Sequence, residues 1–192
     1  MRKPTYYYQK KIEGLTYKSD AIDFCEFESC IFIGCNFSEC SFTAVTFIDC
    51  QFVDCNLNAT KVNHTAFRGV EFKNCQISDV NFAMSDKLIF EIRFANCILD
   101  FSKFYALKMK GTTFTGCSLI AADFMETDLT EVLFDGCDLY RTVFMKSILL
   151  KADFSSSFNY TIDPEINKIK QAIFSREGVK GLLQKYEIQF VS

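Results

Sequence analysis

Large apolar residues recur at every fifth position over most of this chain. The first run consists of Ile22, Phe27, Phe32, Phe37, Phe42, Phe47, Phe52, Leu57, Val62, Phe67, Phe72, Ile77 and Phe82. After a shift of two residues, the pattern resumes at Met84 or Ile89 and continues from Phe94 to Phe154. A period of five matches neither the helical period of about 3.6 residues nor the strand period of about 2. An internal repeat is therefore the first interpretation to consider.

A second column, made of small residues, lies two positions before each large one. It contains all ten cysteines of the chain, together with alanine, serine, threonine and valine. A position shared by these residues requires a compact side chain, and cysteine meets this requirement as a small hydrophobic residue. One large and one small inward residue in every five predict a chain that bends after each short segment around a dry interior. Such a chain is a solenoid.

Four of these segments would complete one square coil of about 20 residues, so the sequence predicts an all-β solenoid. Residues 20–158 would form about seven coils, stacked like parallel strands roughly 4.8 Å apart into a rod about 33 Å long. Five glycines share the position two residues after the large one, where a backbone corner tolerates glycine. They are Gly34, Gly69, Gly111, Gly116 and Gly136.

The repeat resembles the pentapeptide-repeat family, whose motif is a small residue, then Asp or Asn, then Leu or Phe, then two variable residues. The best matches are Ala122-Asp123-Phe124, Thr127-Asp128-Leu129, Cys137-Asp138-Leu139, Ala152-Asp153-Phe154, Cys35-Asn36-Phe37 and Cys55-Asn56-Leu57. The resemblance implies a right-handed quadrilateral β-helix. It also implies that a C-terminal helix and strand join two rods end to end as a homodimer.

The apolar column breaks once, between Phe82 and Ile89, where the first register would place Lys87 in the core. The shift therefore lies within residues 83–88. A small bulge or corner adjustment explains it without any function. Because loops often carry binding residues, a recognition feature is the alternative interpretation.

Segments outside the repeat are expected to cover the open ends of the stack. Residues 1–19 are predicted to form an N-terminal cap, and residues 159–192 a C-terminal capping and dimerisation segment. Ser175 is placed like a helix N-cap, and a short strand over residues 187–191 would follow the helix. The apolar face of this helix is the candidate dimer interface, with a plain intramolecular cap as the alternative. It comprises Val179, Leu182, Leu183 and Tyr186.

The predicted core offers no place for catalysis or for a cofactor. Enzymes need polar groups that converge in a pocket, and a rod filled with Phe, Leu and Cys provides none. His64, the single histidine, is expected to point outward without a partner. Four intervening residues between cysteines formally allow zinc, but structural zinc prefers paired ligands and this column also holds valine and threonine. The cysteines are therefore predicted to be free thiols rather than disulfides or metal ligands.

The chain is expected to be cytoplasmic, with no membrane contact and no direct nucleic-acid binding. The first twenty residues lack the apolar core of a signal peptide, and no later stretch approaches about 18 apolar residues. A net charge of −3 disfavours binding to phosphates. Function must then come from the outer surface of the rod.

The charges on that surface are unevenly distributed along the chain. Residues 20–158 contain 19 acids and 11 bases, a net charge of −8. Two stretches, residues 19–60 and 111–140, carry acids and no Lys or Arg. Both are candidate partner-binding surfaces. Their candidate residues are Glu26, Glu28, Glu39, Asp49, Asp54, Asp123, Glu126, Asp128, Glu131, Asp135 and Asp138.

Two functions remain open at this point. Some members of the family that this chain resembles are acidic, DNA-shaped dimers that bind DNA gyrase or topoisomerase IV and inhibit it or protect it from quinolones. The charge density is low for such a mimic, because about 33 Å of B-DNA carries roughly 19 phosphate charges. The alternative is a structural or protein-interaction module with an unidentified protein partner, in which the acidic residues serve solubility.

Overall fold

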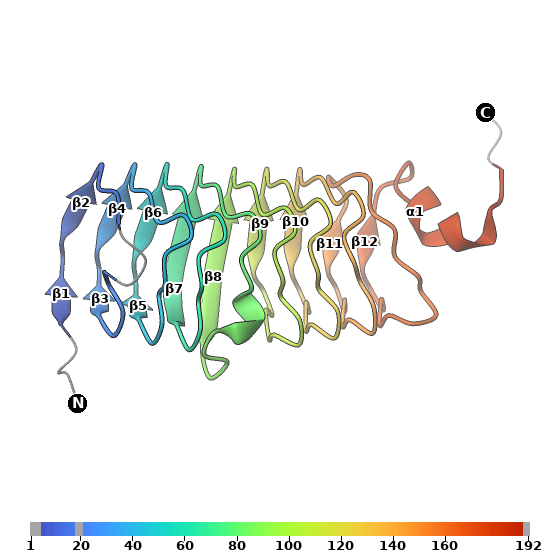
Figure 1. Cartoon of the computed structure of the whole chain (residues 1–192). Helices are drawn as coiled ribbons and strands as arrows, with labels where there is room; N and C mark the ends of the chain where they lie inside the picture. Colours follow the sequence, from blue (N-terminus) through green and yellow to red (C-terminus); the bar gives the residue numbers. More distant parts are fainter. Residues whose placement is uncertain (1–4, 18–20, 190–192) are drawn as a thin grey trace.

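The chain winds into a β-solenoid of about eight turns with a short helix at its C-terminal end (Figure 1). The computed structural model describes residues 5–17 and 21–189. Every strand pair is parallel, and paired residues are usually one coil apart, as Phe27 is from Phe47. The all-β solenoid predicted from the five-residue period is therefore confirmed.

Two sides of the rod carry regular strands that run across the stack in sequence order. One path consists of β1 (Tyr6–Tyr8), β3 (Glu26–Glu28), β5 (Thr46–Ile48), β7 (Ala66–Lys73), β8 (Phe90–Ala95), β9 (Thr113–Thr115), β10 (Leu133–Asp135), β11 (Asp153–Phe154) and β12 (Ile173–Phe174). Beside it, β2 (Lys11–Glu13) pairs with β4 (Ile31–Ile33), β4 with β6 (Gln51–Val53), and β6 with β7. Elsewhere the coils are held by ladders of single bridges, such as Asn36 to Asn56, Lys103 to Asp123 and Lys108 to Asp128.

The coil count differs from the predicted seven because the first turn begins earlier than expected. Residues 5–17, assigned to a separate cap, continue the strand ladder, with Tyr7 opposite Phe27 and Ile12 opposite Phe32. The ring of Tyr7 stacks on Phe27 with centroids 4.8 Å apart. The described part of this segment is thus a coil that also covers the end of the core. Residues 1–4 and 18–19 of the predicted cap lie outside the described residues.

The core is a continuous stack of large side chains that are almost entirely inaccessible to solvent. On one side Phe94, Phe114 and Phe134 stack with centroids 5.2 and 5.0 Å apart. Rings from adjacent sides meet edge to face, as Phe104 and Phe114 do at 6.1 Å. Offset stacks and edge-to-face pairs are the favoured aromatic geometries, and each layer is held by the next. The large column therefore forms one dry core along the rod.

The small column has a second role that its apolar character does not reveal. Buried thiols and hydroxyls in it donate hydrogen bonds to the carbonyl of a large residue in the preceding coil. Cys50 Sγ lies 3.3 Å from the Phe27 carbonyl oxygen, and Thr127 Oγ1 lies 2.8 Å from that of Phe104. Cysteine, serine and threonine share the column because each combines a small volume with a hydrogen-bond donor.

The corners of the coils confirm the prediction made from glycine. The five glycines of that column all have positive φ angles, between 58° and 69°. Most other residues at the same position are also left-handed, including Glu39, Asp49 and His64, with φ between 51° and 59°. The position of His64 at an outer corner agrees with its predicted outward direction.

The register slip lies in residues 82–90, but the core column does not resume where the sequence placed it. Met84 and Ile89 are exposed, and Phe90 fills the vacant core position instead. A 3-10 helix, η1 (Phe82–Met84), leads into the loop that follows, which extends beyond the outline of the neighbouring coils (Figure 1). Phe67 pairs with Phe90, and the register then shifts before Val70. Compared with the preceding coil, the loop after η1 is longer, and the corner between Phe90 and Ile92 has one residue fewer than the corner between Phe67 and Val70.

The C-terminal helix is shorter than the apolar pattern predicts. It consists of α1 (Lys180–Leu183) followed by the 3-10 turn η2 (Gln184–Tyr186). Ser175 Oγ accepts a hydrogen bond from the Gly178 amide at 2.9 Å, as an N-cap would, yet the regular helix begins only at Lys180. Residues 187–189 form no strand, and the rest of the predicted strand lies outside the described residues. Within the described ranges, no helix is long and apolar enough to span a membrane.

Candidate interaction surface

The first acidic group is distributed over several sides of the rod. Glu26 and Glu28 flank the inward Phe27 on β3 and share one side. Asp49 lies at the corner after β5, one coil further along. Asp54 and Glu39 occupy two other corners. The structure thus brings Glu26, Glu28 and Asp49 to one edge of the rod and separates the remaining two from them.

The second acidic group encircles the rod instead of forming a face. Asp123, Asp128 and Asp138 belong to three different bridge ladders, and Asp135 lies on β10. Glu126 and Glu131 are corner residues between them. Because one coil takes about 20 residues, acids that are adjacent in sequence point to all four sides. The acidic stretch at residues 111–140 therefore corresponds to a ring of carboxylates around the rod and not to one acidic face.

Several of these acids have an internal role in building the coil. Asp123 Oδ1 accepts the amide of Met125 at 2.9 Å, and Asp138 Oδ1 accepts that of Tyr140 at 3.0 Å. Asp128 Oδ1 accepts both the amide and the hydroxyl of Thr130. This side-chain turn explains why Asp or Asn precedes the large residue in the repeat. These carboxylates are committed to the fold whether or not a partner binds.

Others are paired with neighbouring coils. Glu131 lies 3.1 Å from Lys151 and 3.5 Å from Lys110, and these ammonium groups lower the pKa of its carboxyl. Glu126 accepts a hydrogen bond from Tyr105, which raises the pKa of that phenol. Similar bonds join Asp135 to Ser156, Asp54 to Asn74 and Glu28 to Tyr6. Among the described residues, the carboxylates of Glu26, Glu39 and Asp49 have no such partner.

Sequence reasoning missed the large apolar residue that is most exposed in the described part of the chain. Leu88, in the loop after η1, is 82% exposed, and Met84 and Ile89 beside it are also exposed. Asp86 Oδ1 accepts the amide of Leu88 at 2.8 Å and shapes the tip. Leu88 falls outside both core columns in either register, and this was the available cue.

The four candidate dimer residues do not share one outward face. Leu182 packs against the core, which makes it part of the cap. Tyr186 donates its hydroxyl to Glu165 Oε1 at 2.7 Å, and Lys185 lies 2.7 Å from both Asp163 and Glu165. Val179 is exposed and Leu183 half-buried. The helix is therefore fastened to its own rod, and Val179 and Tyr186 keep accessible surface.

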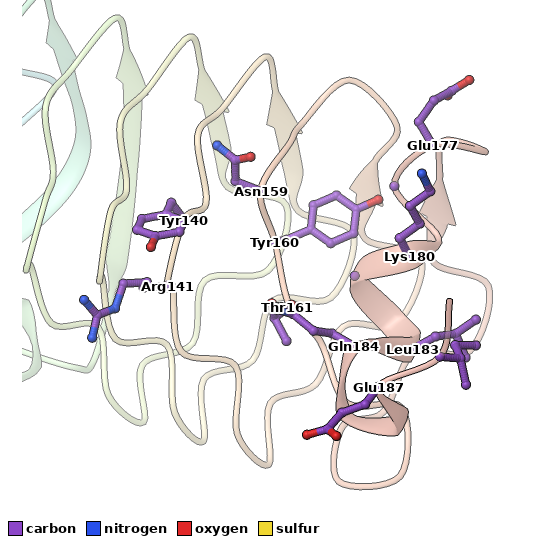
Figure 2. A pocket seen from close by; sticks show the side chains of 13 residues that line it. Tyr140, Arg141, Asn159, Tyr160, Thr161, Glu177, Lys180, Leu183, Gln184 and Glu187 are labelled. Carbon is purple, nitrogen blue, oxygen red and sulfur yellow. Dashed lines mark hydrogen bonds between the residues drawn. The ribbon is translucent and has the colours of Figure 1, made fainter. Parts of the chain in front are cut away.

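A hollow of about 900 Å³ separates α1 from the last coil (Figure 2). Tyr160 forms one wall, packed between Phe154 and Phe174 and against the backbone of Gly178 and Gly181. Arg141, Lys180, Glu177 and Glu187 also line the hollow. Its charges are mixed and do not converge on one point, so it resembles a gap left by the cap more than a binding site. In the described ranges, no three His, Cys, Asp or Glu side chains are grouped to hold a metal ion.

A rod with a dry, hydrogen-bonded core and chemically diverse outer sides is typical of proteins that act through their surface. The sequence matches the family described as pentapeptide repeat region over residues 25–88 and 87–159. The chain therefore belongs to the pentapeptide repeat family. Proteins of this family are generally non-enzymatic.

Solved structures with a similar fold are distant in sequence. Trypsin-treated QnrB1, described as a plasmid-mediated fluoroquinolone resistance protein, is 17% identical, with a TM-score of 0.62, 98% of this chain covered and 100% of the other. Full-length QnrB1 is 16% identical, with a TM-score of 0.55 and coverages of 95% and 100%. HetL, a heterocyst differentiation regulator of the cyanobacterium Nostoc sp. strain PCC 7120, is 8% identical, with a TM-score of 0.43 and coverages of 89% and 86%. No curated protein shows significant similarity. At these identities the likeness establishes the fold.

Proposed function

We propose that this protein is a non-enzymatic rod that binds a type II topoisomerase, DNA gyrase or topoisomerase IV, in place of DNA. Binding would inhibit the enzyme or protect it from quinolones, and it would place the protein in the cytoplasm. The observation that supports this most is the solenoid itself, which follows the fold of the fluoroquinolone resistance protein QnrB1 over nearly the whole chain. The candidate acids without an internal partner in the described ranges, Glu26, Glu39 and Asp49, lie in the N-terminal coils and supply a surface for this contact.

The charge on the rod favours local mimicry over imitation of a whole duplex. The seven coils of the repeat region span about 33 Å, a length over which B-DNA carries roughly 19 charges. The repeat region has a net charge of −8, and bases separate its two acidic stretches. Of the described candidate acids, those at the edge with Glu26, Glu28 and Asp49 combine several carboxylates with few internal bonds. We therefore assign the topoisomerase contact to this edge, since electrostatic steering of association requires only a locally acidic face.

A supercoiling assay with purified gyrase, with and without ciprofloxacin, tests the proposal. We expect the wild-type protein to alter supercoiling or quinolone inhibition at micromolar concentration. The triple variant Glu26→Gln, Glu28→Gln, Asp49→Asn should lose about tenfold or more in potency, because rim charges chiefly set the association rate. A control variant with the same change in net charge is Asp79→Asn, Glu177→Gln, Glu187→Gln. Absence of any effect of the wild-type protein would reject topoisomerase binding, and equal loss in both variants would reject the assigned edge.

A second candidate function is a protein-interaction module with a different partner. The observation that favours it is the exposed loop around Leu88, because exposed apolar clusters often mark protein contacts. Repeated recovery of one non-topoisomerase protein, with release by Leu88→Ser, would support this alternative. Retention of the supercoiling effect by Leu88→Ser would separate the two functions.

We also propose that two rods associate through the C-terminal segment as a homodimer. Val179 and Tyr186 are exposed, and Ile173 and Ile188, also within the C-terminal segment, are exposed as well. Sedimentation analysis should give a dimer for the wild-type protein and a monomer for Val179→Asp, because a charge buried at an interface is costly. Leu182 is unsuitable as a test, since it packs against the core. A wild-type monomer at tens of micromolar protein would contradict the proposal.

A further inference from the structure

The register slip leaves a notch in one corner of the rod. β7 and β8 both run through the same corner of the rod, in neighbouring coils. In the row of residues at this corner, Gly69 lies in the coil before the slip and Gly111 in the coil after it. The intervening coil has no left-handed corner residue, because its strand is one residue shorter there. Because Gly111 has no side chain, a hollow of about 210 Å³ remains, whereas the corresponding space at Gly69 is taken by Asp49 Oδ1. A water molecule occupies about 30 Å³, so a small ligand group fits with several waters.

A hydroxyl in the wall of this notch lacks the partner that its column usually supplies. Other buried serines and threonines of the small column donate to a carbonyl of the preceding coil, as Thr127 does to Phe104. Thr112 belongs to the same column, lines the notch and is only 7% exposed. Within the described part of the chain its hydroxyl makes no hydrogen bond. The hydroxyl is not among the fully buried atoms without a partner, so it opens onto the hollow and can donate to a water or a ligand there.

Two cations border the same hollow. Arg93, on β8, and Lys110, in the next coil, both line it. Glu71, which is opposite Arg93 in the β7–β8 pair, forms an ion pair with Lys73 at 3.1 Å. Glu131 lies 3.1 Å from Lys151 and more loosely, at 3.5 Å, from Lys110. The guanidinium of Arg93 therefore has no ion pair among the described residues.

We propose that this notch binds a carboxylate group. Donors from Thr112, Arg93 and Lys110 surround it, and charge-assisted hydrogen bonds to a carboxylate are the strong ones. Glu91 also lines the notch, so the site has two positive charges and one negative charge. A net charge of +1 matches a group with a single negative charge better than a phosphate dianion. The partner would supply an acidic side chain. This inference does not depend on which protein the partner is.

An acetate titration followed by backbone amide NMR tests the site on the whole chain. At constant ionic strength against chloride, we expect saturable shifts at Gly111, Thr112 and Arg93. Parallel arms use inorganic phosphate and a short peptide with one glutamate side chain and blocked termini. Saturation by acetate with tighter binding of the peptide supports a side-chain ligand, whereas equal affinities point to a free carboxylate. Tighter binding of phosphate, or shifts no larger than those with chloride, would overturn the proposal.

Two variants separate binding from folding. Thr112→Val should weaken acetate binding about fivefold or more without lowering the thermal midpoint, because its hydroxyl makes no internal bond. Thr127→Val is the control, since it removes a used donor and should lower the midpoint. Gly111→Asn fills the notch at low cost, because a Cβ there meets no atom within 4 Å and Asn tolerates a positive φ. Unchanged acetate binding in both Thr112→Val and Gly111→Asn would contradict the assignment.

Discussion

Phe104→Ala is expected to lower the free energy of unfolding by about 3–5 kcal/mol, the usual cost of removing a buried phenylalanine. Its ring is fully buried and stacks on Phe82 at 5.1 Å and on Phe124 at 4.7 Å. It also meets Phe94 and Phe114 edge to face. In a chain of this length the thermal midpoint should fall by about 10 °C or more.

The position of Phe104 in the rod adds to this effect. Each coil of a solenoid contacts only its two neighbours, so a cavity in a middle layer weakens the junction between both halves. Tyr105→Ala is the matched control, because Tyr105 follows Phe104 but points outward and is partly exposed. It should cost about 0.5 kcal/mol, as surface changes usually do. Similar losses in urea unfolding for both variants would mean that the large column does not carry the stability of the rod.

The core could be predicted from the sequence because its two columns are nearly uninterrupted. A side chain that must face inward every fifth residue is selected for size, and that selection is visible in Phe27 or Phe114 without any structure. The first coil was missed because only one of the two columns continues through it. Tyr7, Ile12 and Tyr17 keep the large column in phase, but Lys10 and Leu15 replace the small one. At the end of a stack the small position has no preceding coil to pack against, and both residues are exposed.

The outer surface could not be predicted in the same way. Acids that lie close together in sequence, such as Asp123 and Asp138, are turned to different sides by the coil. Their pairing depends on residues one coil away, as Glu131 depends on Lys110 and Lys151. The notch at Thr112 arises because one corner residue is missing. In the sequence this appears only as part of a two-residue shift in the five-residue repeat. Surface function in a solenoid is therefore a property of neighbouring coils, and a linear charge map does not contain it.

The ten cysteines provide the second large effect. In the native protein we expect none of them to react with Ellman's reagent within minutes, and all ten to react after unfolding in denaturant. All ten are buried thiols outside any disulfide. Burial also raises the pKa of the Cys50 thiol to about 12, so the reactive thiolate is rare at neutral pH. If reaction requires an opening that costs about 4 kcal/mol or more, the native rate should be at least roughly a thousandfold slower.

The order in which the cysteines react should follow the architecture of the rod. Coils at an end have one neighbour and open more easily than those in the middle. Cys25, in the second coil and 8% exposed, should therefore be labelled before Cys97 and Cys117. Mass spectrometry of peptides after brief alkylation measures this order, and Phe104→Ala should accelerate labelling of Cys97 and Cys117 in particular. Rapid labelling of the central cysteines in the folded wild-type protein would mean that the thiol column is open to solvent, which a closed four-sided coil does not allow.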